Sequence, residues 1–347
     1  MIKQLFEQGI AEHIAKGNEA EVGKVGILRG GSTGMIDEEG NILGSCAAEA
    51  YLRFKGIKTG DVDLNKELMF AGGRINEDHW LSVLKTSYDG IIKCEEDIPT
   101  AWETSNGTKV TGRPDIVLCK EDGSPKCGIE LKQVMSVNSA YNVYVEKKPS
   151  LKHLMQAAHY MWQLGCPFEL WYTNRNNLEM PSWMEFRKFP RPEQQTEDVI
   201  GYRYYRSGNI NPKTGKPKKH LITRDDYMNQ TYDKSFAQAS KIKPFVQGFK
   251  LQFQGDQLFM QDAGSDSNPW IPTIVHISYI KRFYEYVSEI DAMNTVPPEA
   301  INIDYTGKVM GWKFSAYSDL GDLHPAHYAG KDLQRWLVKI KKAFPQK

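Results

Sequence analysis

The stretch GRPDIVLCKEDGSPKCGIELK, residues 112 to 132, decides the fold that the sequence predicts. Residues 116 to 119 are apolar and β-prone, and residues 128 to 134 are again typical of a strand. Between them lies Asp122-Gly123-Ser124-Pro125, in which the Asp-Gly pair is a strong signal for a tight turn. The stretch therefore predicts two strands joined as a hairpin.

Three charged side chains of this predicted hairpin are expected to converge. Side chains alternate along a strand, so Glu130 and Lys132 fall on one face and Leu131 on the other. Asp115, at the mouth of the first strand, can reach the same place. Two carboxylates beside one ammonium group are suited to a hard divalent cation that activates water against a phosphate. We therefore expect Asp115 and Glu130 to bind Mg²⁺ or Mn²⁺, with Lys132 as a catalytic residue beside them.

This pattern resembles the PD-(D/E)xK nuclease superfamily. Pro114-Asp115 matches the first motif and Glu130-Leu131-Lys132 the second, although each motif alone is common by chance. Gln156 and Tyr160 lie one turn apart on the helix predicted from residue 151 to residue 164. They match the QxxxY motif of the RecB-like and lambda-exonuclease-like branch. In that branch the pair contacts nucleic acid, so the resemblance implies the same role here.

The resemblance also implies a third acid and a phosphate contact. A helix is predicted over residues 65 to 84, and Gly73 to Trp80 has the G-x-x-x-(E/H) form of the same branch. Glu77 would then complete the catalytic and metal-binding set, whereas the alternative is a solvated glutamate on a helix face. Arg113 stands next to the predicted site, where a guanidinium group is suited to contact a DNA phosphate.

Residues 44 to 56 are similar to the opening helix of the branch, in whose iron–sulfur members an early cysteine binds the cluster. Cys46 takes that place, but no cysteine follows Cys166 in this chain. Because such a cluster needs four thiolates, three of them near the C-terminus, we expect no iron–sulfur cluster. Phe314 and Tyr317 are expected to pack where the later cysteines would stand.

The resemblance implies an α/β fold with a restriction-endonuclease-like αβββαβ core and a mixed central sheet over residues 65 to 180. Residues 1 to 64 are expected to form a helical lead-in, and residues 181 to 347 a helical and loop-rich C-terminal extension packed on the core. Outside the motifs we expect a loop over 135–148, partial helix over 225–250, a helix over 273–293 and a closing helix over 331–344.

Residues 201 to 224 contain no acidic residue and interleave lysines and arginines with tyrosines. Charge for phosphates and rings for stacked bases suit nucleic acid, although a solvated loop that happens to be basic is the alternative. Since the net charge of the chain is only +1, any DNA-binding surface must be local. We expect DNA contacts from Arg203, Arg206, Lys216, Lys218 and Lys219.

The composition, 40% hydrophobic and 25% charged over 347 residues, is that of a soluble globular protein. No apolar run is long enough for a membrane span, and no signal peptide opens the chain. Five cysteines fit free thiols in a reducing compartment. We therefore expect a cytoplasmic protein without a membrane partner, located in the host cytoplasm if the chain is phage-encoded.

The sequence thus predicts a hydrolase of phosphodiester bonds, namely a metal-dependent DNA exonuclease of recombination or repair type, as the likeness to a phage exonuclease implies. DNA ends are the expected partner, with a single-strand annealing protein or further copies of the chain as additional candidates. One alternative is a structure- or sequence-specific endonuclease on the same site. Another is a DNA-binding protein with an inactive nuclease fold, against which the complete set of Asp115, Glu130 and Lys132 argues.

Overall fold

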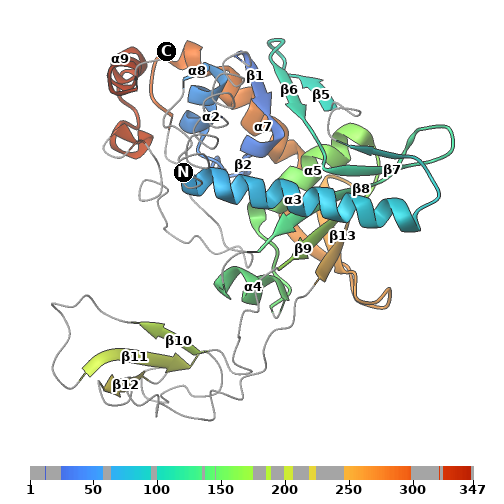
Figure 1. The fold of residues 1–347 in the computed structure, drawn as a ribbon. Helices are drawn as coiled ribbons and strands as arrows, with labels where there is room; N and C mark the ends of the chain where they lie inside the picture. Colours follow the sequence, from blue (N-terminus) through green and yellow to red (C-terminus); the bar gives the residue numbers. More distant parts are fainter. Residues whose placement is uncertain are drawn as a thin grey trace. The chain divides into compact units, whose positions relative to one another are not determined.

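A computed structural model describes residues 12, 25–57, 64–94, 100–134, 137–144, 146–174, 185–188, 199–205, 219–223, 246–297, 320 and 323–344. The chain divides into two compact units, each described by itself below (Figure 1). The first unit combines Met1–Gln133, Lys147–Tyr172 and Gln247–Lys347. The second unit combines Val134–Glu146 and Thr173–Val246.

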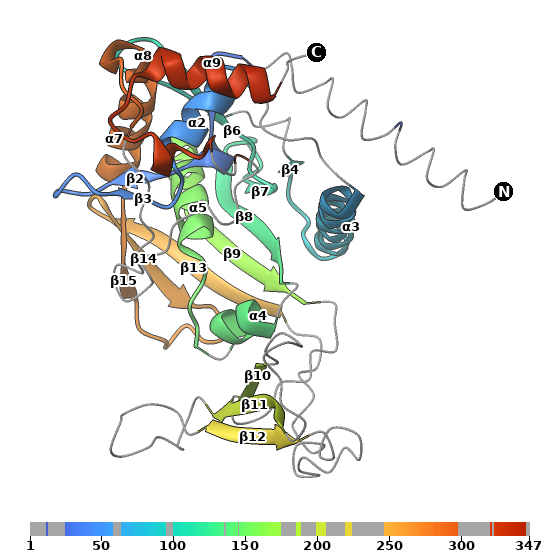
Figure 2. The same cartoon turned by 90° about the vertical axis from the view of Figure 1, so that its left-hand side faces the viewer.

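The centre of the first unit is a mixed sheet of seven strands in the order β15-β14-β13-β9-β8-β7-β4 (Figure 2). Strand β7 is antiparallel to both β4 and β8, and β14 is antiparallel to both β13 and β15. Strands β8 and β9 are parallel, because the amides of Gly128 and Val134 donate to the carbonyls of Pro167 and Thr173 in the same order. The strands are β4 (Ile92–Cys94), β7 (Ile116–Cys119), β8 (Pro125–Gln133), β9 (Phe168–Thr173), β13 (Val246–Gln254), β14 (Gln257–Asp262) and β15 (Ile271–His276).

Two helices cover opposite faces of this sheet (Figure 2). Leu84 of α3 (Leu64–Ser87) packs in one cluster with the buried side chain of Ile116. Leu164, the last residue of α5 (Leu151–Leu164), packs instead against Val117. Because neighbouring residues of a strand point to opposite faces, α3 and α5 bury the two sides of β7. The chain is therefore mixed α/β, as the sequence predicts.

The predicted hairpin and the long helix after it are confirmed. Strands β7 and β8 pair Ile116 with Ile129, and Gly123 in their turn has φ +79°, a conformation that favours glycine. Helix α5 ends at Gly165, which has φ +64° and donates its amide to the carbonyl of Met161. Position 128 also requires glycine, because a Cβ atom there would lie 2.1 Å from the ring of Phe168.

The other elements of the first unit flank the sheet. A three-stranded sheet has the order β1-β6-β5, and β2 pairs with β3. These strands are β1 (Ile27–Arg29), β2 (Met35–Ile36), β3 (Ile42–Leu43), β5 (Thr100–Glu103) and β6 (Lys109–Gly112). The helices are η2 (Gly30–Ser32), α2 (Ala47–Phe54), α7 (Ile277–Ser288), α8 (Ile290–Met293), η8 (Pro325–His327) and α9 (Leu333–Ala343).

The second unit contains one helix and one antiparallel sheet in its described part. The helix is α4 (Val137–Tyr144), and the sheet has the order β10-β11-β12. Its strands are β10 (Glu185–Lys188), β11 (Val199–Tyr205) and β12 (Lys219–Thr223). In the described parts of the chain, no helix is both long and apolar enough to cross a membrane.

The structure also describes the segments on either side of the hairpin. Strand β6, which precedes β7, pairs with β1 and β5 and lies outside the central sheet. The break between β6 and β7 contains Pro114, which lacks the N–H group that a strand needs for pairing in a sheet. The expected loop over 135–148 instead contains the helix α4.

Two expectations in the C-terminal part were also wrong. Strands β13 to β15 belong to the central sheet, whereas this region was expected to be helical and loop-rich. Residues 246 to 250, the described end of the expected partial helix, lie in β13, and residues 225 to 245 lie outside the described residues. The helix expected from residue 273 begins only at Ile277, because Thr273-Ile274-Val275 is a β-branched run that favours the strand β15. The expected aromatic packing of Phe314 and Tyr317 lies outside the described residues.

Candidate functional site

Glu130 and Lys132 lie on the face of β8 that α5 covers. Gly128, two residues earlier on the same face, meets the ring of Phe168, whereas Leu131 packs in the cluster on the α3 side. The Glu130 side chain is fully buried, and the Nζ atom of Lys132 lies 2.5 Å from its Oε1 atom. The strand therefore holds a carboxylate and an ammonium group side by side beneath a helix.

Asp115 joins this pair from the neighbouring strand. It follows the buried Pro114 and directly precedes β7, so its carboxylate stands at the end of that strand. Its Oδ2 atom accepts the amide N–H of Leu131 at 2.7 Å and lies 3.9 Å from Nζ of Lys132. The structure thus brings together the three side chains that the sequence pattern places at one site.

The charges in this cluster are unevenly balanced. Burial, followed by the charge of Asp115, raises the pKa of Glu130 to about 8, although the charge and hydrogen bond of Lys132 oppose the rise. Burial would lower the pKa of Lys132, but Glu130 and Asp115 together raise it above its ordinary value. Among the described residues, the Oε2 atom of Glu130 has no hydrogen-bond partner. Lys132 therefore stays charged, whereas Glu130 is a buried carboxyl group that holds its proton more tightly than usual and has one oxygen without a partner among the described residues.

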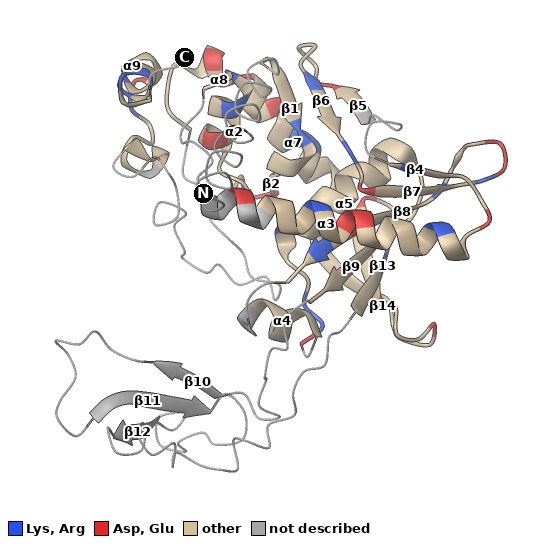
Figure 3. Ribbon diagram, viewed as in Figure 1, with Lys and Arg blue, Asp and Glu red and all other residues tan. Residues whose placement is uncertain are grey.

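Glu77 lies close enough to this cluster to act on it electrostatically. It is a half-buried residue of α3, which packs alongside β8, and its charge contributes to raising the pKa of both Glu130 and Lys132. Acidic residues lie at the middle of α3, next to β7 and β8 (Figure 3). Among the residues that the structure describes, however, no three His, Cys, Asp or Glu side chains are gathered closely enough to hold a metal ion. Asp115 and Glu130 are therefore the donor pair that the geometry offers, with Glu77 as a nearby charge.

Gln156 and Tyr160 reach the same site from α5. The Nε2 atom of Gln156 donates to the hydroxyl of Tyr160 at 3.1 Å. Tyr160 is 3% exposed, and burial, followed by the charge of Glu130, raises the pKa of its hydroxyl. The ring of Tyr160 also packs against Phe168 of β9, which fixes it over the sheet. The QxxxY pair thus borders the carboxylates from the helix side.

The remaining predicted DNA contacts lie in different places. Arg113 is exposed and precedes Pro114-Asp115 at the site. Arg203 belongs to β11 and Lys219 begins β12, both in the second unit, where Arg203 is paired with Arg187 and His220. Arg206, Lys216 and Lys218 lie outside the described residues.

Sequence reasoning missed a polar pair that borders Lys132. His153 of α5 has its Nδ1 atom 2.9 Å from the hydroxyl of Tyr172 in β9. A signal was present, because His153, Gln156 and Tyr160 are spaced i, i+3, i+7 and share one face of a helix.

Comparison with known proteins adds little to this geometry. No family model matches the chain, and no curated protein matches it. The chain is similar to a solved structure entitled "Crystal structure of SSO0001", with 19% sequence identity and a TM-score of 0.30. The similarity covers 49% of this chain and 75% of that chain. At this level the likeness supports no conclusion about activity.

Proposed function

We propose that the chain is a metal-dependent DNA nuclease of the PD-(D/E)xK superfamily, on the RecB-like and lambda-exonuclease-like branch, and that it acts as an exonuclease. One observation carries the proposal: the fully buried Glu130 and the carboxylate of Asp115 both lie within 4 Å of one ammonium group, that of Lys132, at 2.5 Å and 3.9 Å. Burying a carboxylate beside a second carboxylate costs free energy that a purely structural residue would not require. Such perturbed groups cluster at functional sites.

The arrangement of elements around Glu130 supports the same assignment. Helix α3, strands β4, β7 and β8, helix α5 and strand β9 follow one another in the chain, with β5, β6 and α4 interposed. This order matches the one expected of a restriction-endonuclease-like core, in which a helix, three strands, a helix and a strand follow one another. The strands lie next to one another in the sheet in the order β9-β8-β7-β4.

The donor set fits a divalent cation. The unpartnered Oε2 atom of Glu130 and the carboxylate of Asp115 are hard oxygen donors of the kind that Mg²⁺ and Mn²⁺ bind, with Glu77 the candidate third acid. A bound cation would lower the pKa of a water molecule and offset charge on the scissile phosphate. Because its own pKa is raised, Lys132 stays charged and stabilises the phosphate in the transition state rather than removing a proton.

Further residues of each unit would hold the substrate. Gln156 and Tyr160 border the carboxylates from α5, and Arg113 is exposed beside Asp115. Arg203 and Lys219, in the second unit, are proposed to contact DNA phosphates. DNA ends are the proposed partner, in the cytoplasm of a cell or of a phage host, with an annealing protein or further copies of the chain as additional candidates.

A cleavage assay tests this function. End-labelled linear single- and double-stranded DNA and closed circles would be incubated with Mg²⁺ or Mn²⁺, with EDTA as the metal-free control. We expect linear DNA to be shortened from its ends in a metal-dependent way. Nicking of closed circles would indicate an endonuclease instead. Binding without cleavage, under all of these conditions, would indicate a DNA-binding protein with an inactive nuclease fold.

A further inference from the structure

A hydrogen-bonded chain links the start of α5 to the strand beside Lys132. The backbone amide of Ser150 donates to the hydroxyl oxygen of Tyr172 at 3.2 Å. The same hydroxyl lies 2.9 Å from Nδ1 of His153, one turn into α5. Tyr172 is 2% exposed, so this hydroxyl is held inside the protein.

These bonds favour one tautomer of His153. The hydroxyl of Tyr172 accepts the amide N–H of Ser150, and among the described residues Nδ1 of His153 is the acceptor available for the hydroxyl hydrogen, so Tyr172 donates to Nδ1. A nitrogen that accepts a hydrogen bond is bare, and in a neutral imidazole the proton then sits on Nε2. Burial, followed by the charges of Lys132 and Lys152, lowers the pKa of His153 to about 3, which agrees with a neutral ring. His153 is therefore an uncharged donor through Nε2–H.

The strand register places this donor at the proposed active site. Strands β8 and β9 are parallel, and the ring of Phe168 faces Gly128 on the α5 side of the sheet. Side chains two residues further along each strand share that face, and so do those four residues further. Tyr172 is thus the neighbour of Lys132 on the face where Glu130 lies.

The ring of His153 is half-buried, and the structure gives Nε2 no hydrogen-bond partner within the described part of the chain. The exposed Lys152 precedes it on the first turn of α5. On the same helix face, Gln156 and Tyr160 follow at the next two turns. His153 therefore lies near Lys132, and Tyr160, two turns further along this helix face, lies near Glu130.

We propose that His153 donates Nε2–H to a non-bridging phosphate oxygen of a nucleic acid strand seated at Lys132, with Lys152 supplying positive charge beside it. This contact rests on the proposed function for the identity of the ligand. Tyr172 is the positioning residue, because it selects the tautomer of His153 and ties the start of α5 to β9. The ammonium group of Lys132 attracts this phosphate through its charge, and the hydrogen bond from His153 orients the phosphate.

Equilibrium binding of a fluorescent DNA oligonucleotide in EDTA tests the contact without cleavage. His153→Gln keeps an N–H group near the position of Nε2, whereas His153→Asn carries its amide at the position of Nδ1. We expect His153→Asn to weaken binding about tenfold, the effect of one hydrogen bond to a charged group, and His153→Gln to weaken it much less. Because the donor is neutral, neither change should alter the dependence of log K on log salt. Lys152→Gln should reduce that slope by about one.

Equal binding by wild type and His153→Asn, or an equal loss in both variants, would overturn the contact. Melting temperatures would identify a variant that fails to fold. In that case the ¹⁵N resonances of the wild-type imidazole decide: Nε2 should be the protonated nitrogen, and its signal should move when the oligonucleotide binds. An unmoved signal at saturating DNA overturns the proposal. Normal metal-dependent cleavage by His153→Asn, with unchanged binding, would leave the nuclease assignment intact and remove only this contact.

Discussion

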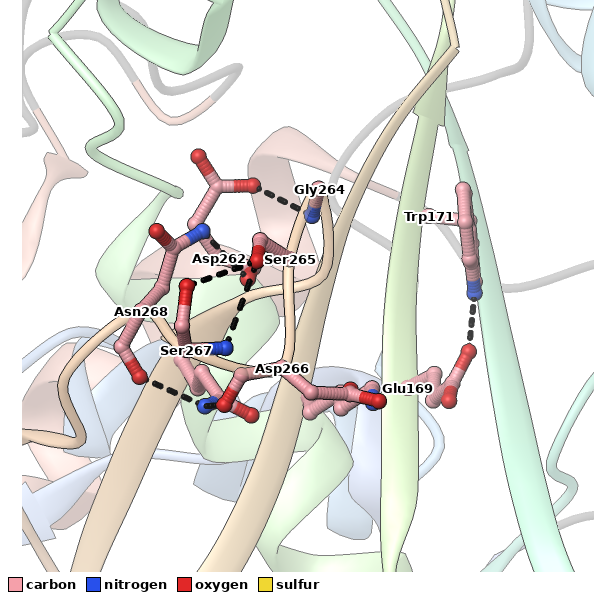
Figure 4. A network of polar contacts seen from close by, with 10 residues as sticks. Glu169, Trp171, Asp262, Gly264, Ser265, Asp266, Ser267 and Asn268 are labelled. Carbon is pink, nitrogen blue, oxygen red and sulfur yellow. Dashed lines mark hydrogen bonds and ion pairs between the residues drawn. The ribbon is translucent and has the colours of Figure 1, made fainter.

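The central sheet carries two groups of lysines and carboxylates that differ in burial. At one, Glu130 is fully buried and contacts Lys132 near Asp115. At the other, Lys250 pairs with Asp266, whose side chain is 88% exposed. The second group lies in the loop after β14, where the amide of Gly264 and the side chain of Asn268 bond to Asp262 (Figure 4). Both groups pair a lysine with carboxylates, so residue type alone does not distinguish them.

The pKa directions separate the two groups. The pKa of Asp266 is lowered, first by its hydrogen bond from Lys250. Burial would raise the pKa of Asp262, but the amide of Gly264, Gln247 and Lys147 lower it overall. The pKa of Glu130 is instead raised, to about 8. The loop therefore stabilises the charged forms of Asp262 and Asp266, whereas the surroundings of Glu130 in β8 disfavour its charged form. A lysine–carboxylate contact indicates a functional site only where burial leaves a polar atom without a hydrogen-bond partner.

The largest expected effect is on cleavage. Lys132→Ala should lower the rate of metal-dependent DNA cleavage by about 10²–10⁴-fold, because it removes the ammonium group that contacts both carboxylates. The rate would be measured under single-turnover conditions with saturating protein. Lys250→Ala is the matched control from the exposed group and should stay within about twofold of wild type. Equal rates for the two variants would contradict the proposed role of Lys132.

The next effect is on stability and depends on pH. The pKa of Glu130 rises from 4.5 to about 8 on folding, so the folded protein holds this proton more tightly than the unfolded chain. Its contribution is fully present below pH 4.5 and is lost as the pH rises through 8. In EDTA, the free energy of unfolding should therefore fall by a few kcal/mol across this window, at up to about 1.4 kcal/mol per pH unit.

Urea unfolding at a series of pH values checks this dependence. Glu130→Gln has no carboxyl proton to lose, so its stability should vary less between pH 5 and 8 than that of the wild type. Adding Mg²⁺ at pH 8 should restore part of the wild-type stability, since a cation that binds the folded state stabilises it by mass action. A parallel fall in wild type and Glu130→Gln would show that another group titrates.

The sequence predicts the part of the site that one strand specifies. Alternation along residues 128 to 134 is enough to place Glu130 and Lys132 together, and Gln156 and Tyr160 follow from helical spacing. The burial of Glu130 does not follow from such a pattern. That burial depends on α5 covering the same face of the sheet. An E-x-K pattern occurs equally well on a solvent-exposed strand.

The missed elements were those that long-range pairing decides. Strands β13 to β15 join the sheet next to β9, far away in sequence, in a region that was expected to be helical and loop-rich. Tyr172 became visible as a neighbour of Lys132 only through the parallel register of β8 and β9. Such pairing depends on the whole fold, so single-strand patterns do not reveal it.

A smaller effect concerns packing beneath the buried group. A Cβ at position 128 would lie 2.1 Å from the ring of Phe168, on which Tyr160 also packs. Gly128→Ala should therefore cost about 1–3 kcal/mol of unfolding free energy and lower DNA affinity by shifting Tyr160. Gly264→Ala is the matched change in the exposed loop, where the nearest atom is Oδ1 of Asp262 at 3.3 Å. Chemical unfolding of both variants should find Gly264→Ala the milder one, and the opposite order would contradict the packing described for β8.

The smallest expected effect is the most specific test of the comparison. Asp266→Asn removes a carboxylate whose partner, Lys250, is free to return to water, because both side chains lie at the surface. Exposed ion pairs contribute little to stability, so the melting temperature should not change measurably. Its rise on addition of Mg²⁺ should equal that of the wild type, whereas Glu130→Gln should lose most of that rise. If Asp266→Asn lost it instead, the cation would be binding the exposed loop, and the unsatisfied oxygen of Glu130 would no longer mark the metal site.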